Sequence, residues 1–142
     1  MNTKPPQEQI INQAFKCHSQ GNILEAAKNY QYFIKQSYKD HRVFSNYGII
    51  LRDLGKLQEA EISLRKAIEI KPDYAEAHSN LGTVLKDLGN FSDAINHFKQ
   101  AIKLNDKLSI AKAGLIETNG NICDWSYQDI QNIWLPISLG SM

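Results

Sequence analysis

The sequence predicts an all-α fold built from stacked helix–turn–helix repeats. Part of the chain repeats itself with a step of 34 residues, and each copy holds two helix-length apolar patterns separated by a glycine. One further helical pattern follows the last copy. A fixed period of this length is typical of solenoids, in which each repeat packs only against its neighbours.

Ten identical residue pairs carry the period. They are Ser45/Ser79, Asn46/Asn80, Gly48/Gly82, Leu51/Leu85, Asp53/Asp87, Leu54/Leu88, Gly55/Gly89, Ala60/Ala94, Ala67/Ala101 and Ile68/Ile102. A weaker copy precedes them in the same register, with matches that include Asn12 and Ala14. The repeats are therefore expected at residues 7–40, 41–74 and 75–108, after a short flexible leader at residues 1–6.

Within the second repeat, apolar residues recur at three- and four-residue steps before Gly55, which indicates an amphipathic first helix. Glycine ends that helix because it takes the left-handed conformation at little cost. A second apolar pattern follows and stops at Pro72, since proline disfavours helical geometry in the residue before it. The third repeat follows the same scheme with Gly89.

Small residues recur where two helix backbones are expected to approach closely. The two series are Ala14/Gly48/Gly82 and Ala26/Ala60/Ala94. A larger side chain at such a contact overpacks it, at a cost of about 1–3 kcal/mol. These positions therefore predict the seams of the helix pairs.

These residues resemble the tetratricopeptide repeat (TPR), a 34-residue helix–turn–helix with a small residue in each helix and a proline near its end. The resemblance implies a solenoid wound as a right-handed superhelix. The first repeat departs from the pattern, with Phe33 in a usual small slot and Tyr38 in the proline slot, which fits a terminal repeat. The third repeat has Asp106 in place of the proline, so its second helix is expected to run on.

Residues 109–121 form the further helical pattern, and we expect them to cap the open end of the third repeat. The junction segment 122–142 follows and contains Cys123, Asp124, Trp125 and Ser126. This stretch, at this place behind the array, resembles the end of the N-terminal TPR region of O-linked N-acetylglucosamine transferases and their relatives. Seven or eight helices are expected in all.

The composition is that of an ordinary globular protein, 42% hydrophobic and 22% charged. A net charge of +1 gives no electrostatic reason to expect nucleic acid or an anionic membrane as partner. Cys17 and Cys123 have no metal or redox spacing, and Cys17 is expected to be a small buried apolar residue. Without a signal-peptide pattern, the chain is interpreted as cytoplasmic.

No catalytic constellation stands out, so we expect no enzyme activity, cofactor or metal in this chain. The four histidines share no metal-ligand spacing and are interpreted as surface or partly buried helix residues; they are His18, His41, His78 and His97. Asp53 and Asp87 lie one repeat apart, which indicates a repeated surface feature and not an acid–base pair.

The binding surface is expected on the first helix of each repeat, which lines the inner, concave groove of TPR arrays. Asn12, Asn46 and Asn80 occupy one slot there, and an asparagine amide offers both an acceptor and donors to an extended peptide. An equally weighted interpretation is structural, with the asparagines capping or bridging helices. The charged neighbours expected to add selection are Arg52, Lys86, Asp53 and Asp87.

The function predicted from these features is a non-catalytic scaffold that binds a protein or extended peptide in the groove. The alternative from the resemblance is the substrate-recruiting arm of an O-linked N-acetylglucosamine transferase-like enzyme, whose catalytic domain is absent from this chain. A third possibility is assembly through the apolar ends of the solenoid, as a weak homodimer.

Overall fold

The computed structural model describes residues 5–121, and within that range the chain forms seven α-helices and no strand. The helices are α1 (Gln7–Ser19), α2 (Ile23–Lys35), α3 (His41–Asp53), α4 (Leu57–Ile70), α5 (Ala75–Asp87), α6 (Phe91–Leu104) and α7 (Ser109–Asn121). Three antiparallel pairs therefore coincide with the three predicted repeats, and α7 follows as the predicted additional helix.

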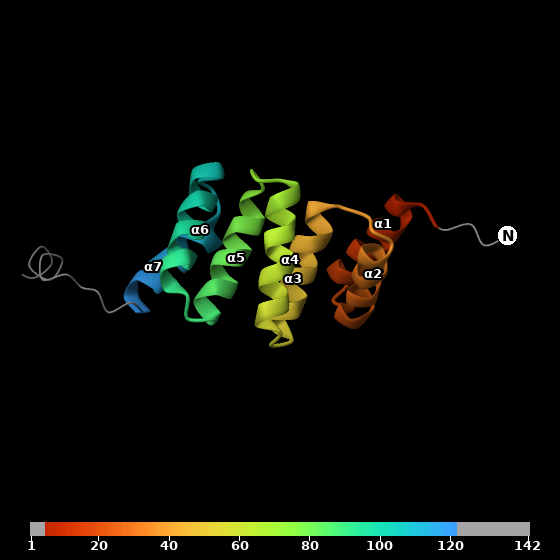
Figure 1. The fold of residues 1–142 in the computed structure, drawn as a ribbon, viewed down its shortest axis with the longest axis horizontal. Helices are drawn as coiled ribbons and strands as arrows, with labels where there is room; N and C mark the ends of the chain where they lie inside the picture. The colour runs from red at the N-terminus through yellow and green to blue at the C-terminus, as the bar shows by residue number, and fades with distance from the viewer. Residues whose placement is uncertain (1–4, 122–142) are drawn as a thin grey trace, which may run out of the picture.

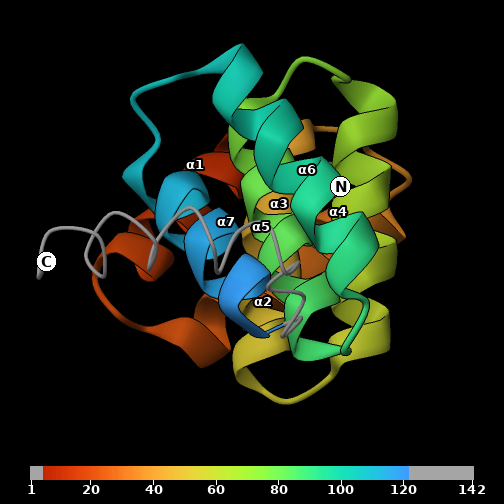
Figure 2. The ribbon, with the colours of Figure 1, turned by 90° about the vertical axis from the view of Figure 1, so that its left-hand side faces the viewer.

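The helix pairs stack side by side into an elongated array, with α1 and α2 at one end and α7 at the other (Figure 1). Helix α3 packs against α5, and α5 packs against α7, so these three helices form one layer. Seen along the array from the α7 end, α4 and α6 lie to one side of α7 (Figure 2). The architecture is thus the predicted all-α solenoid.

The helices end for local reasons. Gly55 and Gly89 follow α3 and α5 with φ of 77° and 81°, the left-handed conformation in which glycine is favoured. The expectation that α6 runs on for want of a proline is wrong, because α6 ends at Leu104 and Asn105 is extended. The Asn105 side chain accepts a hydrogen bond from the backbone N–H of Lys107 at 3.1 Å, and this turn replaces helical bonding.

The predicted seams of small residues are confirmed. Ala26, Ala60 and Ala94 are fully buried. A Cβ added at Gly48 would lie 2.7 Å from Leu64 Cγ, and one added at Gly82 would lie 2.8 Å from ring carbons of Phe98. Each first helix therefore approaches the large apolar residue of its own second helix too closely for a side chain.

Helix α7 covers the apolar end of the third repeat, as predicted. Ala111 and Thr118 are fully buried, and a Cβ added at Gly114 would lie 2.5 Å from Phe98 Cζ. The other side of α7 carries Ile110 and Ile116, which are 67% and 74% exposed. Helix α7 is therefore the first helix of a fourth unit without a described second helix.

The first repeat is attached to the second by an irregular turn. The loop after α2 holds Ser37 at a φ of 61°, in the region that favours glycine. Tyr38 occupies the proline slot, and the centre of its ring lies 5.3 Å from the centre of the Phe33 ring. Phe33 is fully buried although it occupies a usual small slot. Asp40 begins α3 as an N-cap, accepting the Arg42 backbone N–H at 2.8 Å.

Most of the expected leader and all of the junction segment lie outside the described residues, so the interpretation of Cys123–Ser126 remains a prediction. Across residues 5–121, no helix is both long and apolar enough to span a bilayer.

Candidate functional site

The three asparagines of the predicted ladder lie on α1, α3 and α5, on what we call the inner face: the solvent side of the odd-numbered helices that carries Asn12, Asn46 and Asn80. Asn12 is exposed, whereas the other two are partly buried. Asn80 Nδ2 donates to Ser45 Oγ at 3.1 Å, and Asn46 Nδ2 donates to Tyr30 Oη at 3.3 Å. Each of these two amides thus bridges consecutive repeats through its N–H group, and its carbonyl oxygen can accept a further hydrogen bond.

The predicted charged residues also meet across repeats. Arg52 Nε on α3 donates to Asp87 Oδ2 on α5 at 2.6 Å, and Asp53 lies 3.7 Å from the same guanidinium. Lys86 Nζ lies 2.7 Å from Glu117 Oε2 on α7. Glu117 was missed from the sequence because it lies in the degenerate fourth unit, where the period no longer identifies it.

These contacts tie the inner face from α3 to α7. The Arg52 and Asp87 side chains are 33% and 28% exposed, so their ion pair is partly shielded from solvent. Because Arg52 and Lys86 already have carboxylate partners, an incoming anion competes with an existing ion pair at either site. The two cations of the stripe are therefore less available to an anionic ligand than the sequence alone indicates.

The junction of the first and second repeats is built differently. Tyr30, in the slot that Leu64 and Phe98 occupy in the other repeats, is fully buried, and its hydroxyl lies 3.0 Å from His18 Nδ1 as well as near Asn46. Burial is the main cause that raises the pKa of Tyr30, so its hydroxyl stays protonated at neutral pH. The three side chains form one hydrogen-bonded network across α1, α2 and α3.

A hollow of about 260 Å³ opens on the inner face at this junction. The residues that line it are Phe15, His18, Ser19 and Asn46. The Arg42 guanidinium lies 5.2 Å from the centre of the Phe15 ring and pairs with both carboxylate oxygens of Asp40. Burial opposes ionisation of Asp40, but its bonds to Arg42 hold its pKa below the usual value.

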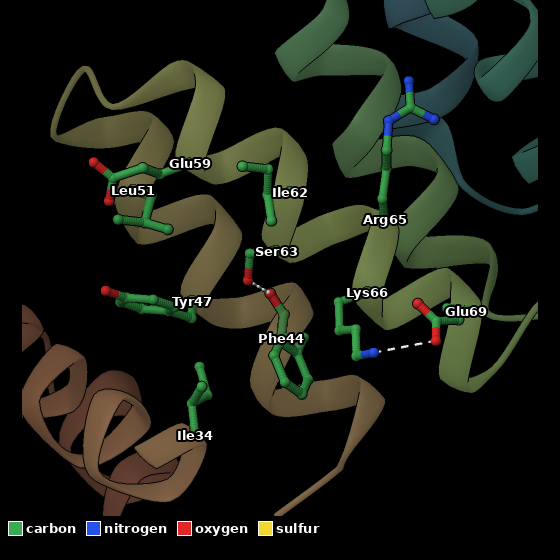
Figure 3. A pocket seen from close by; sticks show the side chains of 10 residues that line it. All are labelled: Ile34, Phe44, Tyr47, Leu51, Glu59, Ile62, Ser63, Arg65, Lys66 and Glu69. Carbon is green, nitrogen blue, oxygen red and sulfur yellow. Dashed lines mark hydrogen bonds and ion pairs between the residues drawn. The ribbon is translucent and has the colours of Figure 1, made fainter. Parts of the chain in front are cut away.

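A larger hollow of about 640 Å³ lies on the other side of α3, between α2 and α4 (Figure 3). Its walls are mainly apolar, and the ion pair of Lys66 with Glu69 lies at one edge. Inside it, Ser63 Oγ donates to the Phe44 carbonyl oxygen at 2.7 Å. The residues that line it are Ile34, Phe44, Tyr47, Leu51, Glu59, Ile62, Ser63, Arg65, Lys66 and Glu69. The sequence did not indicate this hollow, because it depends on how α2 packs on the second repeat.

Two of the four histidines form a pair that the sequence did not predict. His78 and His97 place their Nδ1 atoms 3.1 Å apart, and His78 Nε2 lies 2.8 Å from the Pro72 carbonyl oxygen. The ring centres are 5.4 Å apart, so the two nitrogens point almost directly at each other and form a hydrogen bond. The interpretation of His78 as a surface or partly buried residue is wrong, since it is 7% exposed.

Cys17 is 5% exposed in α1, which confirms its interpretation as a small buried residue. Among the residues that the structure describes, no three His, Cys, Asp or Glu side chains gather in a way that could hold a metal ion.

Comparison with known proteins places the fold. The tetratricopeptide repeat family model matches residues 40–107. A comparison with curated protein sequences finds no match.

Solved structures show the same architecture at low sequence identity. The first TPR domain of Spaghetti (RPAP3), bound to the HSP90 peptide SRMEEVD, is 18% identical with a TM-score of 0.76, covering 83% of this chain and 94% of that one. The TPR2B domain of yeast Sti1, in a complex with pHsp70, is 19% identical with a TM-score of 0.72, covering 81% of this chain and 97% of that one.

A mutant O-GlcNAc transferase of Thermobaculum terrenum is 22% identical with a TM-score of 0.75, covering 83% of this chain but 23% of that one. The match therefore concerns a fraction of the bacterial enzyme. Together, the family-model match, the paired helices and these likenesses show that residues 40–107 match the tetratricopeptide repeat family and that residues 5–121 have the fold of a tetratricopeptide-repeat solenoid.

Proposed function

We propose that the chain is a non-catalytic scaffold that binds an extended peptide segment of a partner protein along the inner face. The observation that carries the proposal is the row of asparagines. Asn46 and Asn80 each donate one amide N–H to a bridge between repeats, and each has a carbonyl oxygen that can accept a further hydrogen bond. Such oxygens can accept main-chain N–H groups of a peptide without reading its sequence.

Two solved relatives in fold support this class of ligand, since the Spaghetti domain is bound to an HSP90 peptide and the Sti1 domain is in a complex with pHsp70. The Spaghetti peptide, SRMEEVD, has three acidic residues among its last four. In this chain Arg52 and Lys86 are paired with Asp87 and Glu117. We therefore expect a ligand held mainly through its main chain, with weak charge selection by Arg52, Lys86, Asp53 and Asp87.

The test begins with a displayed random-peptide library selected on the immobilised protein, followed by Kd measurements on the enriched peptides by fluorescence anisotropy. The double variant Asn46→Ala/Asn80→Ala is expected to weaken binding at least tenfold, about 1.4 kcal/mol. A matched control is Gln58→Ala/Asn96→Ala, which removes two exposed amides from α4 and α6. The control is expected to bind like the wild type.

The asparagine bridges also stabilise the fold, by about 0.5–1.5 kcal/mol each. Circular dichroism therefore has to show that the Asn46→Ala/Asn80→Ala variant is fully folded at the assay temperature. If no peptide is enriched, or if the folded variant binds as tightly as the wild type, the inner face is not the binding site and the asparagines are structural only.

A second candidate is the substrate-recruiting arm of an O-linked N-acetylglucosamine transferase-like enzyme. It is favoured by the Cys123–Ser126 stretch behind the array and by the fold likeness to the Thermobaculum terrenum enzyme. The test is the coding sequence in its genome: a reading frame that continues past Met142 into a nucleotide-sugar-binding domain supports this role, and a stop codon there contradicts it.

A further inference from the structure

The inner face changes character between α1 and α3. In the second repeat Ser45 accepts a hydrogen bond from Asn80, but the corresponding residue of the first repeat is Ile11, whose side chain has no acceptor. Asn46 therefore bonds to the Tyr30 hydroxyl instead. The Asn80–Ser45 bridge thus has no equivalent between the first and second repeats, where the hollow lined by Phe15, His18, Ser19 and Asn46 opens.

The size of this hollow limits what it can hold. Sites for drug-sized ligands and cofactors have volumes of about 300–1,000 Å³. At about 260 Å³ and open to solvent, the hollow is suited to one side chain of a larger ligand. It lies on the same face as the asparagines, so a peptide bound along that face passes over it.

The hydrogen bonds around Tyr30 favour one tautomer of His18. The Tyr30 oxygen accepts the Asn46 N–H, and the arrangement that also uses the hydroxyl hydrogen directs it to His18 Nδ1 at 3.0 Å. A neutral imidazole that accepts at Nδ1 carries its hydrogen on Nε2. No described residue bonds to that Nε2, so His18 presents one N–H donor.

The hydrogen-bond acceptors of the hollow can be identified in the same way, from the hydrogen bonds that Asn46 and Ser19 already make. Asn46 donates to Tyr30 through Nδ2, which leaves Oδ1 to accept. The Ser19 hydroxyl donates to the Lys16 carbonyl oxygen at 2.9 Å, which leaves the lone pairs of its Oγ. The nearby cation Arg42 is neutralised by Asp40. The hollow therefore offers a neutral donor, neutral acceptors and the aromatic ring of Phe15.

We propose that this hollow is a subsite for a primary carboxamide, the side chain of a glutamine or asparagine in the bound peptide. The ligand carbonyl accepts from His18 Nε2–H, the ligand amide group donates to Asn46 Oδ1 or Ser19 Oγ, and the flat amide lies against Phe15. A carboxylate lacks the donor, and an aliphatic side chain leaves the donor and the acceptors unpaired. The inference rests on the proposed peptide-binding function.

The experiment takes a peptide enriched on the wild type and replaces each of its positions in turn by Gln, Asn, Glu and Leu, with Kd measured by anisotropy. One position is expected at which Gln or Asn binds at least tenfold more tightly than both Glu and Leu. His18→Ala is expected to abolish that preference while peptides without Gln or Asn keep their Kd within about twofold. Thr83→Ala, a change on α5 outside the hollow, is the matched control and keeps the preference.

A second measurement does not depend on a variant. Long-range ¹H–¹⁵N correlation spectra of the wild type are expected to show His18 in the Nε2–H form, with its Nε2 resonance shifted by the Gln peptide and not by the Leu peptide. Peptides that bind through Asn80 without any carboxamide preference, or without moving the His18 resonance, overturn the subsite alone. Failure of every peptide to bind overturns the proposed function and the subsite together.

Discussion

A single added methyl group tests the packing that defines these repeats. Gly82 lies in the middle of α5, where a Cβ would come within 2.8 Å of Cδ1 and Cε1 of Phe98. Carbon atoms pack best at about 3.5–4.0 Å, so Gly82→Ala requires the ring or the helix to move. The Phe98 ring is fully buried, and its tip is also in close contact with Gly114 of α7, which restricts that movement.

Two effects set the size of the change. Overpacking a well-filled core costs about 1–3 kcal/mol. Alanine in place of glycine inside a helix stabilises by about 1 kcal/mol. The expected net result for Gly82→Ala is a loss of about 0–2 kcal/mol in the free energy of unfolding.

The clean comparison is with the same substitution at Gly120 in α7, where a Cβ meets nothing within 4 Å. Gly120→Ala has the propensity gain without the clash, so it is expected to exceed Gly82→Ala in stability by about 1–3 kcal/mol. Urea unfolding followed by circular dichroism measures both differences. In a Phe98→Ala background, which removes Cδ1 and Cε1 of the ring, Gly82→Ala is expected to lose most of its cost, a coupling that the double-mutant cycle reports directly.

Two outcomes would refute this reasoning. One is that Gly82→Ala stabilises the wild-type protein as much as Gly120→Ala does. The other is that Gly82→Ala costs the same in the Phe98→Ala background as in the wild-type protein. Either outcome means that the backbones of α5 and α6 separate freely, and that glycine is not required at this seam.

Three further predictions concern other parts of the fold. Ser37→Gly is expected to raise stability by about 0.5–1 kcal/mol, because Ser37 is held at a φ of 61° that glycine adopts with less strain; equal midpoints in urea would contradict this. Asp40→Ala is expected to lower the free energy of unfolding by about 1 kcal/mol through loss of the α3 N-cap, whereas Asp40→Asn is expected to keep most of the wild-type stability because asparagine also caps helices; equal stabilities of the Ala and Asn variants would argue against the cap. Burial and then the neighbouring His78 lower the pKa of His97 below 6.5, so the unfolded state takes up a proton first and stability is lost as pH falls from about 6.5 towards the folded pKa, with no effect above that window. The urea midpoint is expected to change less with pH across this range in His97→Gln than in the wild type. The pH dependence that remains is expected from His41, whose pKa is also lowered by burial; an unchanged pH dependence would contradict the assignment to His97.

The helices themselves were predictable because their signals are local. Apolar steps of three and four residues, Gly55 and Gly89 after the first helices, and the small residues at the seams all act within one repeat or between its two helices. The error at the end of α6 was also local: the side chain of Asn105 ends the helix without a proline. The 34-residue period then predicted that the repeats stack on one another, because repeats with the same apolar face bury that face in the same way.

The partners of the candidate site residues were decided by tertiary structure. Arg52 meets Asp87, and Asn80 meets Ser45, across 35 positions of sequence, a separation set by how one repeat is rotated on the next. The asparagine slot was visible in the sequence, which left a bridging role as one of two interpretations; the tertiary structure decided that the amides of Asn46 and Asn80 bridge repeats. Whether they also hold a ligand remains a proposal.

The sequence by itself determined the number and order of the helices in the repeats, because those depend on short-range periodicity and on backbone preferences of single residues. Only the tertiary structure decided that Tyr30 joins His18 to Asn46, that His78 pairs with His97, and that hollows open on both sides of α3 at the first junction. Those features arise from side chains on different helices, and their distances depend on the packing of layers that no local pattern specifies.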